Sequence, residues 1–96
     1  MPRRRRGKVQ LICVRDGVVK YWPAQSLRAC QEIVAEWAYT EMRMSLAESS
    51  LLAMSVVPGV HVWREGIVWL VGCPGSSSLA AEAEKWRDEQ LRQTSD

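Results

Sequence analysis

Turn signals built on glycine divide this chain into short extended segments. Asp16-Gly17 separates two apolar runs, and glycine accepts the positive φ angle that a tight two-residue hairpin turn needs. Pro58-Gly59 suits a type II turn, with proline at the second position and glycine at the third. Glu65-Gly66 turns the chain again within a later apolar stretch. The sequence therefore predicts brief strands joined by tight turns.

The first hairpin is predicted to pair residues 9–14 with residues 18–22. A two-residue loop places Arg15 opposite Val18 and Ile12 opposite Tyr21. Because side chains alternate between the two sides of a strand, each face of the hairpin has its own set of residues. One face carries Ile12, Val14, Val19 and Tyr21, and the other carries Leu11, Cys13, Val18 and Trp22 with Arg15 and Lys20.

A three-strand meander is predicted from residues 54–57, 60–64 and 67–71. Both of its faces are apolar, whereas a single solvated face should be polar. The predicted faces are Val56, Trp63, Val68 and Leu70 with His61 on one side, and Val57, Val60, Val62, Ile67, Trp69 and Val71 on the other.

The longest helical pattern begins after Ser26, a residue type favoured at helix N-caps. Apolar residues recur at helical spacing from Leu27 to Ala38, so Trp37 is expected in the core, while Glu32 and Glu36 share the polar side. Two weaker helical signals follow. Residues 45–48 (Ser-Leu-Ala-Glu) match a capping box and predict a second short helical turn, and serines 76–78 precede a last amphipathic helix.

The predicted fold class is α+β, an antiparallel sheet of about five short strands (β-β-α-β-β-β-α) with two helices packed on one face. Residues 1–7 are predicted to form a basic arm, residues 8–93 a single α+β domain, and residues 94–96 a frayed tail. Five strands about 4.8 Å apart make a sheet about 24 Å wide, whereas two helices about 10 Å across cover about 20 Å. Two helices therefore cover one face of such a sheet and leave the other open.

The open face is the predicted contact surface, because a large exposed apolar patch is uncommon on a soluble monomer. Tryptophan often anchors interfaces, although the five tryptophans could also serve as core in a chain without phenylalanine. The predicted partner-binding residues are Trp63, Trp69, Val62 and Ile67 on the sheet, and Glu32 and Glu36 on the acidic helix face. The alternative is a bent sheet whose second face is hidden by residues 47–53.

Positive charge is concentrated at the N-terminus. Arg3, Arg4, Arg5, Arg6 and Lys8 are five of the 13 basic residues, and the rest of the chain has eight basic against 11 acidic residues, a net charge of −3. Such an arm is suited to non-specific contact with phosphates, to docking on an acidic protein surface, or to solvation alone. No predicted helix carries a basic face that could read a DNA groove.

Catalytic and metal chemistry find little support in the residue types present. His61 is the single histidine, and Cys13, Cys30 and Cys73 are odd in number and form no C-x-x-C pair, so neither a metal site nor a cofactor is predicted. The same cysteine pattern favours a reduced, cytoplasmic protein, and no apolar run approaches the length of a membrane span.

These observations favour a small non-enzymatic intracellular binding protein that acts sterically on a protein or a protein–nucleic acid complex, with a homodimer also expected. In size and element order the chain resembles small phage-encoded inhibitors of host systems, anti-CRISPR proteins among them, which implies an inhibitory role. The alternative is a nucleic-acid-binding accessory protein that uses the arginine arm.

Overall fold

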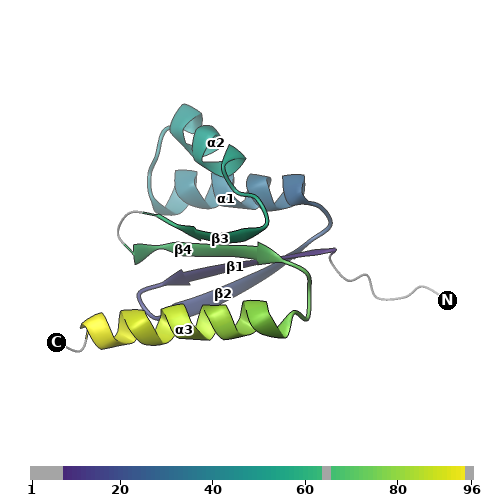
Figure 1. The fold of residues 1–96 in the computed structure, drawn as a ribbon. Coiled ribbons are helices and arrows are strands. Elements are labelled where there is room, and N and C mark those ends of the chain that lie inside the picture. The colour runs from purple at the N-terminus through teal and green to yellow at the C-terminus, as the bar shows by residue number, and fades with distance from the viewer. Residues whose placement is uncertain (1–7, 64–65, 95–96) are drawn as a thin grey trace.

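The computed structural model describes residues 8–63 and 66–94, which form an antiparallel sheet with helices on both sides (Figure 1). Within these residues, the elements in chain order are β1 (Val9–Arg15), β2 (Val18–Ala24), α1 (Leu27–Glu41), α2 (Leu46–Met54), β3 (Gly59–Val62), β4 (Val68–Gly72) and α3 (Ser77–Thr94). The order of the strands across the sheet is β2-β1-β4-β3, so β1 and β4 are central and β2 and β3 are the edges.

The β1–β2 hairpin has the predicted turn and register. Asp16 and Gly17 both have positive φ angles, of 53° and 77°, as a two-residue turn of this kind requires. Arg15 pairs with Val18 and Ile12 pairs with Tyr21. The turn is also held from a distance, because the side chain of Gln90 on α3 accepts a hydrogen bond from the Gly17 N–H at 2.8 Å.

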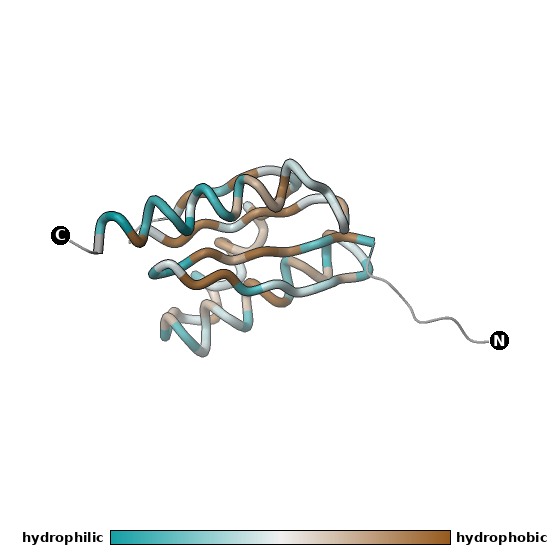
Figure 2. Tube along the Cα trace, turned by 90° about the horizontal axis from the view of Figure 1, so that it is seen from below, coloured by the Kyte–Doolittle hydropathy of each residue, from teal (hydrophilic) through white to brown (hydrophobic). Residues whose placement is uncertain are grey.

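The α+β class is confirmed, but the helices lie on both faces of the sheet and not on one. Figure 1 shows α1 and α2 on one side of the sheet and α3 on the other. In Figure 2 the strands are largely brown, whereas α3 is largely teal, as expected for a helix that is polar on its outer side. The core therefore has two layers. Between the sheet and the layer of α1 and α2, the core contains Leu11, Cys13, Val34, Trp37, Ala38, Trp69 and Val71. Between the sheet and α3, it contains Ile12, Val14, Val68, Leu70 and Ala83.

The number of elements differs from the prediction because residues 46–54 form a helix. The capping box at its start is confirmed: the Glu48 N–H donates to Ser45 Oγ at 3.1 Å, and the Ser45 N–H donates to Glu48 Oε1 at 3.4 Å. The helix then continues through Met54, so the strand expected at 54–57 does not form. The described residues thus contain four strands and three helices in place of the expected five and two.

The register of β3 against β4 also differs from the prediction by one residue. Val62 pairs with Val68 and His61 pairs with Trp69, and the Trp63 N–H donates to the Ile67 carbonyl at 2.7 Å. The connection is therefore three residues long, 64–66, and not the two-residue Glu65-Gly66 turn. A shift of one residue moves every side chain of a strand to the other face. Trp63 consequently lies on the face of Trp69, and Val62 on the opposite face.

Candidate partner-binding surface

Of the two tryptophans predicted to anchor a partner, Trp69 lies instead in the core under α1, and Trp63 is partly buried and packs against that core. Trp69 is fully buried, and Ile67 is 1% exposed, so neither lies on an open face. The Trp69 ring centroid lies 5.2 Å from that of Trp37, 5.5 Å from that of Trp63 and 5.8 Å from that of Trp22. Trp37 is core as predicted, and the expectation of an open, tryptophan-bearing sheet face is wrong because α1 covers it.

The other residues predicted to contact a partner are exposed but do not form one site. Val62 is 58% exposed on the edge strand β3, on the face opposite α1. Glu32 and Glu36 are exposed on α1, where Glu32 forms an ion pair with Arg28 at 3.8 Å. The fold therefore separates the acidic helix face from Val62. Of the predicted arm, Arg3, Arg4, Arg5 and Arg6 lie outside the described residues, and Lys8 is exposed just before β1.

An exposed apolar surface does exist, on the outer side of α2. Leu46, Leu51 and Met54 have exposed fractions of 69%, 69% and 70%, higher than any other large hydrophobic residue described. The opposite side of the same helix is buried through Ser49 and Ala53, whose small side chains allow α2 to lie close to α1. We call Leu46, Leu51 and Met54 the α2 face.

The α2 face is held in place by contacts at both ends of the helix. The capping box fixes its first turn. Beyond its last turn, the side chain amide of Gln31 on α1 donates to the Val56 carbonyl at 3.0 Å, and Val56 itself is fully buried. A partner would thus meet a preformed helix and would not have to order it.

The sequence predicts a short helical turn after Ser45, but neither the full length of α2 nor its exposed apolar side. One signal was available: between Met44 and Trp63, Glu48 is the single charged side chain, in a sequence that is 25% charged. Of the ten large hydrophobic residues exposed in the described part of the chain, six belong to this segment: Leu46, Leu51, Met54, Val57, Val60 and Val62.

A shallow depression of about 200 Å³ lies beside the β1–β2 turn, on the α1 side of the sheet. The guanidinium carbon of Arg15 lies 5.6 Å from the centroid of the Trp37 ring, a cation–π contact that partly covers the tryptophan cluster. The lining of the depression contains both cationic and anionic side chains, so the depression has no strong preference for an anion or a cation. The lining residues are Cys13, Arg15, Asp16, Val18, Lys20, Trp37 and Glu41.

The thiol at the base of this depression is unsuited to nucleophilic chemistry. Burial raises the pKa of Cys13 to about 12, although Arg15 and Lys20 act in the opposite direction. Burial likewise raises the pKa of Cys30. Since the thiolate is the nucleophile, Cys13 is protonated and inert at neutral pH.

The remaining polar groups also give no reactive cluster in the part of the chain that is described. The Nε2 atom of His61 lies 3.2 Å from the Val57 main-chain nitrogen, so the ring is engaged by the loop before β3. Among residues 8–63 and 66–94, no group of three histidine, cysteine, aspartate or glutamate side chains could hold a metal ion. None of the helices described has the length and apolar character needed to span a bilayer.

The fold and this surface define a small α+β protein with an antiparallel sheet between helical layers and an exposed apolar helix. Comparison of the chain with protein-family models, with curated proteins and with solved structures finds no match.

Proposed function

We propose that this protein is a small, non-enzymatic binding protein that acts sterically on a macromolecular partner, and that the α2 face makes the central contact. The observation that supports this proposal is the exposure of Leu46, Leu51 and Met54, each about 70% accessible on a well-anchored helix. An apolar helix face is normally buried against another element. The partner would supply the covering that this chain lacks.

The free energy gained by burying the α2 face is large enough for specific binding. Burying one large aliphatic side chain contributes about 1.5–3 kcal/mol, so three together contribute about 5–9 kcal/mol before the costs of association. Glu48 is the one charged residue of α2, and its carboxylate is already engaged with Ser45. The α2 face therefore suits an apolar groove on the partner, in the manner of an amphipathic helix bound in a groove.

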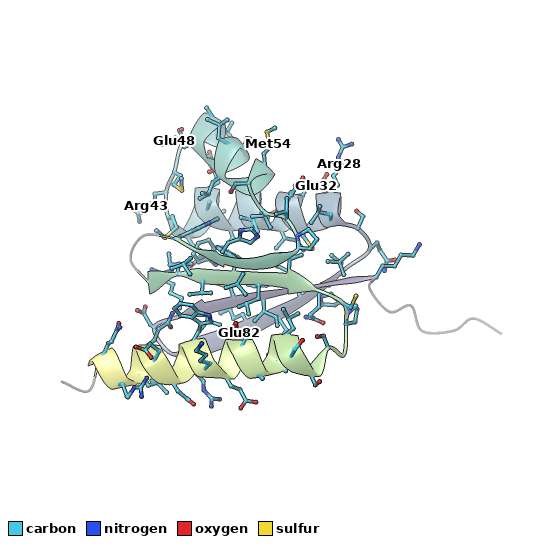
Figure 3. The ribbon with its side chains drawn as sticks, viewed as in Figure 1. Arg28, Glu32, Arg43, Glu48, Met54 and Glu82 are labelled. Atoms are coloured by element: carbon cyan, nitrogen blue, oxygen red, sulfur yellow. The ribbon has the colours of Figure 1, made fainter. Side chains whose placement is uncertain are left out.

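Charged residues flank the α2 face and would form the rim of such an interface. Figure 3 shows Glu48 and Met54 on α2 and Arg28 and Glu32 on α1, all directed away from the sheet. Rim charges of this kind influence the rate of association and the choice of partner more than they influence affinity. In this proposal Glu32 and Glu36 contact the partner at the rim of the interface.

Within this function we favour a cytoplasmic inhibitor of the phage-encoded kind, resembling anti-CRISPR proteins. The support for this finer proposal is size and the α+β class; the observed element order, ββααββα, differs from the order on which the resemblance was first based.

The test is purification of the tagged chain from its native cell after cross-linking, followed by mass spectrometry of the captured complex. The Leu51→Glu/Met54→Glu variant should lose the partner, because two carboxylates would have to be desolvated in the apolar contact. Ala81→Glu, on the exposed side of α3, is the matched control and should retain it. Equal capture by both variants would exclude the α2 face as the contact.

The concentration of positive charge at the N-terminus supports a second candidate, a nucleic-acid-binding accessory protein. Arg3, Arg4, Arg5, Arg6 and Lys8 would contact phosphates without reading sequence. Five phosphate contacts predict a slope of about −4 to −5 in a plot of log affinity against log salt for a random duplex. Replacing the four arginines with glutamine should reduce that slope to near −1. A slope that the replacement leaves unchanged would exclude the arm.

A further inference from the structure

The two edges of the sheet are protected to different degrees. Edge strands expose unpaired main-chain groups, and proteins block them with charged side chains, proline or bulges. Strand β2 carries Lys20 and Pro23. Strand β3 has the sequence Gly-Val-His-Val, with neither a charged side chain nor a proline. Since β3 is the outermost strand of its side, no strand within residues 8–63 and 66–94 pairs with its outer edge.

The hydrogen-bond pattern of β3 identifies the main-chain groups that face outward. The Trp63 N–H donates to the Ile67 carbonyl, so Trp63 and Ile67 form a hydrogen-bonded pair with β4. Hydrogen-bonded and non-bonded pairs alternate along an antiparallel ladder. His61 therefore bonds to β4 as Trp63 does, while the N–H and C=O groups of Val60 and Val62 point away from β4.

The side chains along this edge are apolar and accessible. Val60 and Val62 are 40% and 58% exposed. They lie on the α3 side of the sheet, but α3 packs over β1, β4 and β2 and leaves β3 largely uncovered. On the other side, the His61 ring is turned toward Val57. No charged residue occurs between Ser49 and Trp63, so nothing in this segment repels a like segment.

We propose that β3 pairs with β3 of a second copy of this chain, antiparallel and about a two-fold axis at His61, to join the two sheets into one. In this register Val60 lies opposite Val62 of the other copy, and both exchange the main-chain bonds that point outward. The valines of both copies then form one apolar cluster on the α3 side, since directly opposed side chains are in contact. About a two-fold axis the contact between Val60 and Val62 occurs twice, so the edge of β3 is complementary to itself. This favours a second copy over an unrelated strand.

This inference is independent of what the α2 face binds. The dimer would carry two α2 faces, so a partner with two binding sites would be held by both. The two proposals have separate tests, because one depends on the α2 side chains and the other on the main chain of β3.

The first experiment measures the mass of the purified chain by light scattering over a range of concentrations. The expected result is a species of twice the 10.9 kDa chain mass. Val62→Pro removes one outward N–H and should abolish the dimer, whereas Val62→Thr keeps the N–H and a β-branched side chain and should retain it. Leu51→Glu should leave the dimer intact. A 10.9 kDa species at every concentration, or a dimer that survives Val62→Pro or is lost in Leu51→Glu, would overturn the proposal.

A cross-linking experiment tests the register and does not depend on the folding of the proline variant. Opposed residues of a non-hydrogen-bonded pair have Cα atoms about 4.5 Å apart, within disulfide range. In a Cys73→Ser background, which removes the exposed native thiol, His61→Cys should form a disulfide-linked dimer under mild oxidation. Tyr39→Cys, exposed on α1, is the control and should remain monomeric. Cross-linking no faster at position 61 than at position 39 would contradict the β3 pairing.

Discussion

Gln90 is expected to make an unusually large contribution to stability for a polar side chain on a surface helix. It is 8% exposed, near the end of α3. Its Oε1 accepts from the Gly17 N–H at 2.8 Å, and its Nε2 donates to the Val14 carbonyl at 3.1 Å and to the Gly66 carbonyl. One amide therefore ties both strand connections, at residues 16–17 and 64–66, to the same turn of α3.

The size of this contribution follows from the groups that lose their partner. Gln90→Ala would remove the partner of the Gly17 N–H, and an unsatisfied buried group costs about 1–3 kcal/mol. The Val14 carbonyl would lose a second donor but would remain paired with Val68 in the β1–β4 ladder. Water can reach Gly66, which is exposed, so the cost there is small. We therefore expect a loss of about 1–3 kcal/mol, a substantial part of the 5–15 kcal/mol total that is usual for a domain.

Urea denaturation followed by tryptophan fluorescence measures this loss. Gln93→Ala, exposed on the same helix, is the control and should change the free energy of unfolding by less than about 0.5 kcal/mol. Gln90→Glu adds a test of geometry, because a carboxylate would face two carbonyl oxygens and its pKa would rise. This variant should become less stable as the pH rises above about 4.3, the ordinary glutamate value. A Gln90→Ala loss below about 1 kcal/mol would refute this reasoning.

Three further predictions use the same denaturation assay. Trp69→Ala should cost about 3–5 kcal/mol by opening a cavity among three other tryptophans, and Trp69→Phe should cost clearly less; equal costs would contradict the ring packing. Ser45→Ala should cost about 0.5–2 kcal/mol through loss of the capping box, with Ser50→Ala, exposed on the same helix, as the neutral control. Burial raises the pKa of Cys13 from 9.0 to about 12, so the unfolded chain loses this proton first and stability should fall as the pH rises through that interval. Cys13→Ala should remove that part of the pH dependence, and an identical profile in the variant would show that the thiol is not shielded.

The turn and register of the first hairpin could be predicted because their determinants are local, although β2 continues two residues beyond its predicted end at Trp22, through Pro23 and Ala24. Asp16 and Gly17 are residue types that tolerate positive φ, and a two-residue loop leaves a single register for the strands that it joins. The faces of β1 follow from that register alone. Ile12 and Val14 accordingly lie together against α3, and Leu11 and Cys13 lie together under α1.

The helical layers could not be predicted in the same way, because their positions depend on contacts between distant segments. The apolar spacing of α1 shows which side of the helix is buried but not which face of the sheet receives it. The thin apolar stripe of α3 gives even less information, since Ala83 and Gln90 gain their significance only from the strands that they contact. Both faces of β4 are apolar because each face has its own helical layer.

The single residue that separates the two registers of β3 decides where a partner could bind. With a two-residue turn, Val62 would share a face with Trp69, and a partner surface of tryptophan and valine would be reasonable. With residues 64–66 in the connection, Trp63 is on the same face as Trp69 and packs against it, partly buried, while Val60 and Val62 lie on the α3 side at an edge that α3 leaves largely uncovered. Trp63 and Trp69 thus pack together under α1, and the exposed apolar surface lies on the outer side of α2 and at the edge of β3. The low charge of residues 49–63 is consistent with this placement, because a segment that is covered only after association has no use for charges that it must then desolvate.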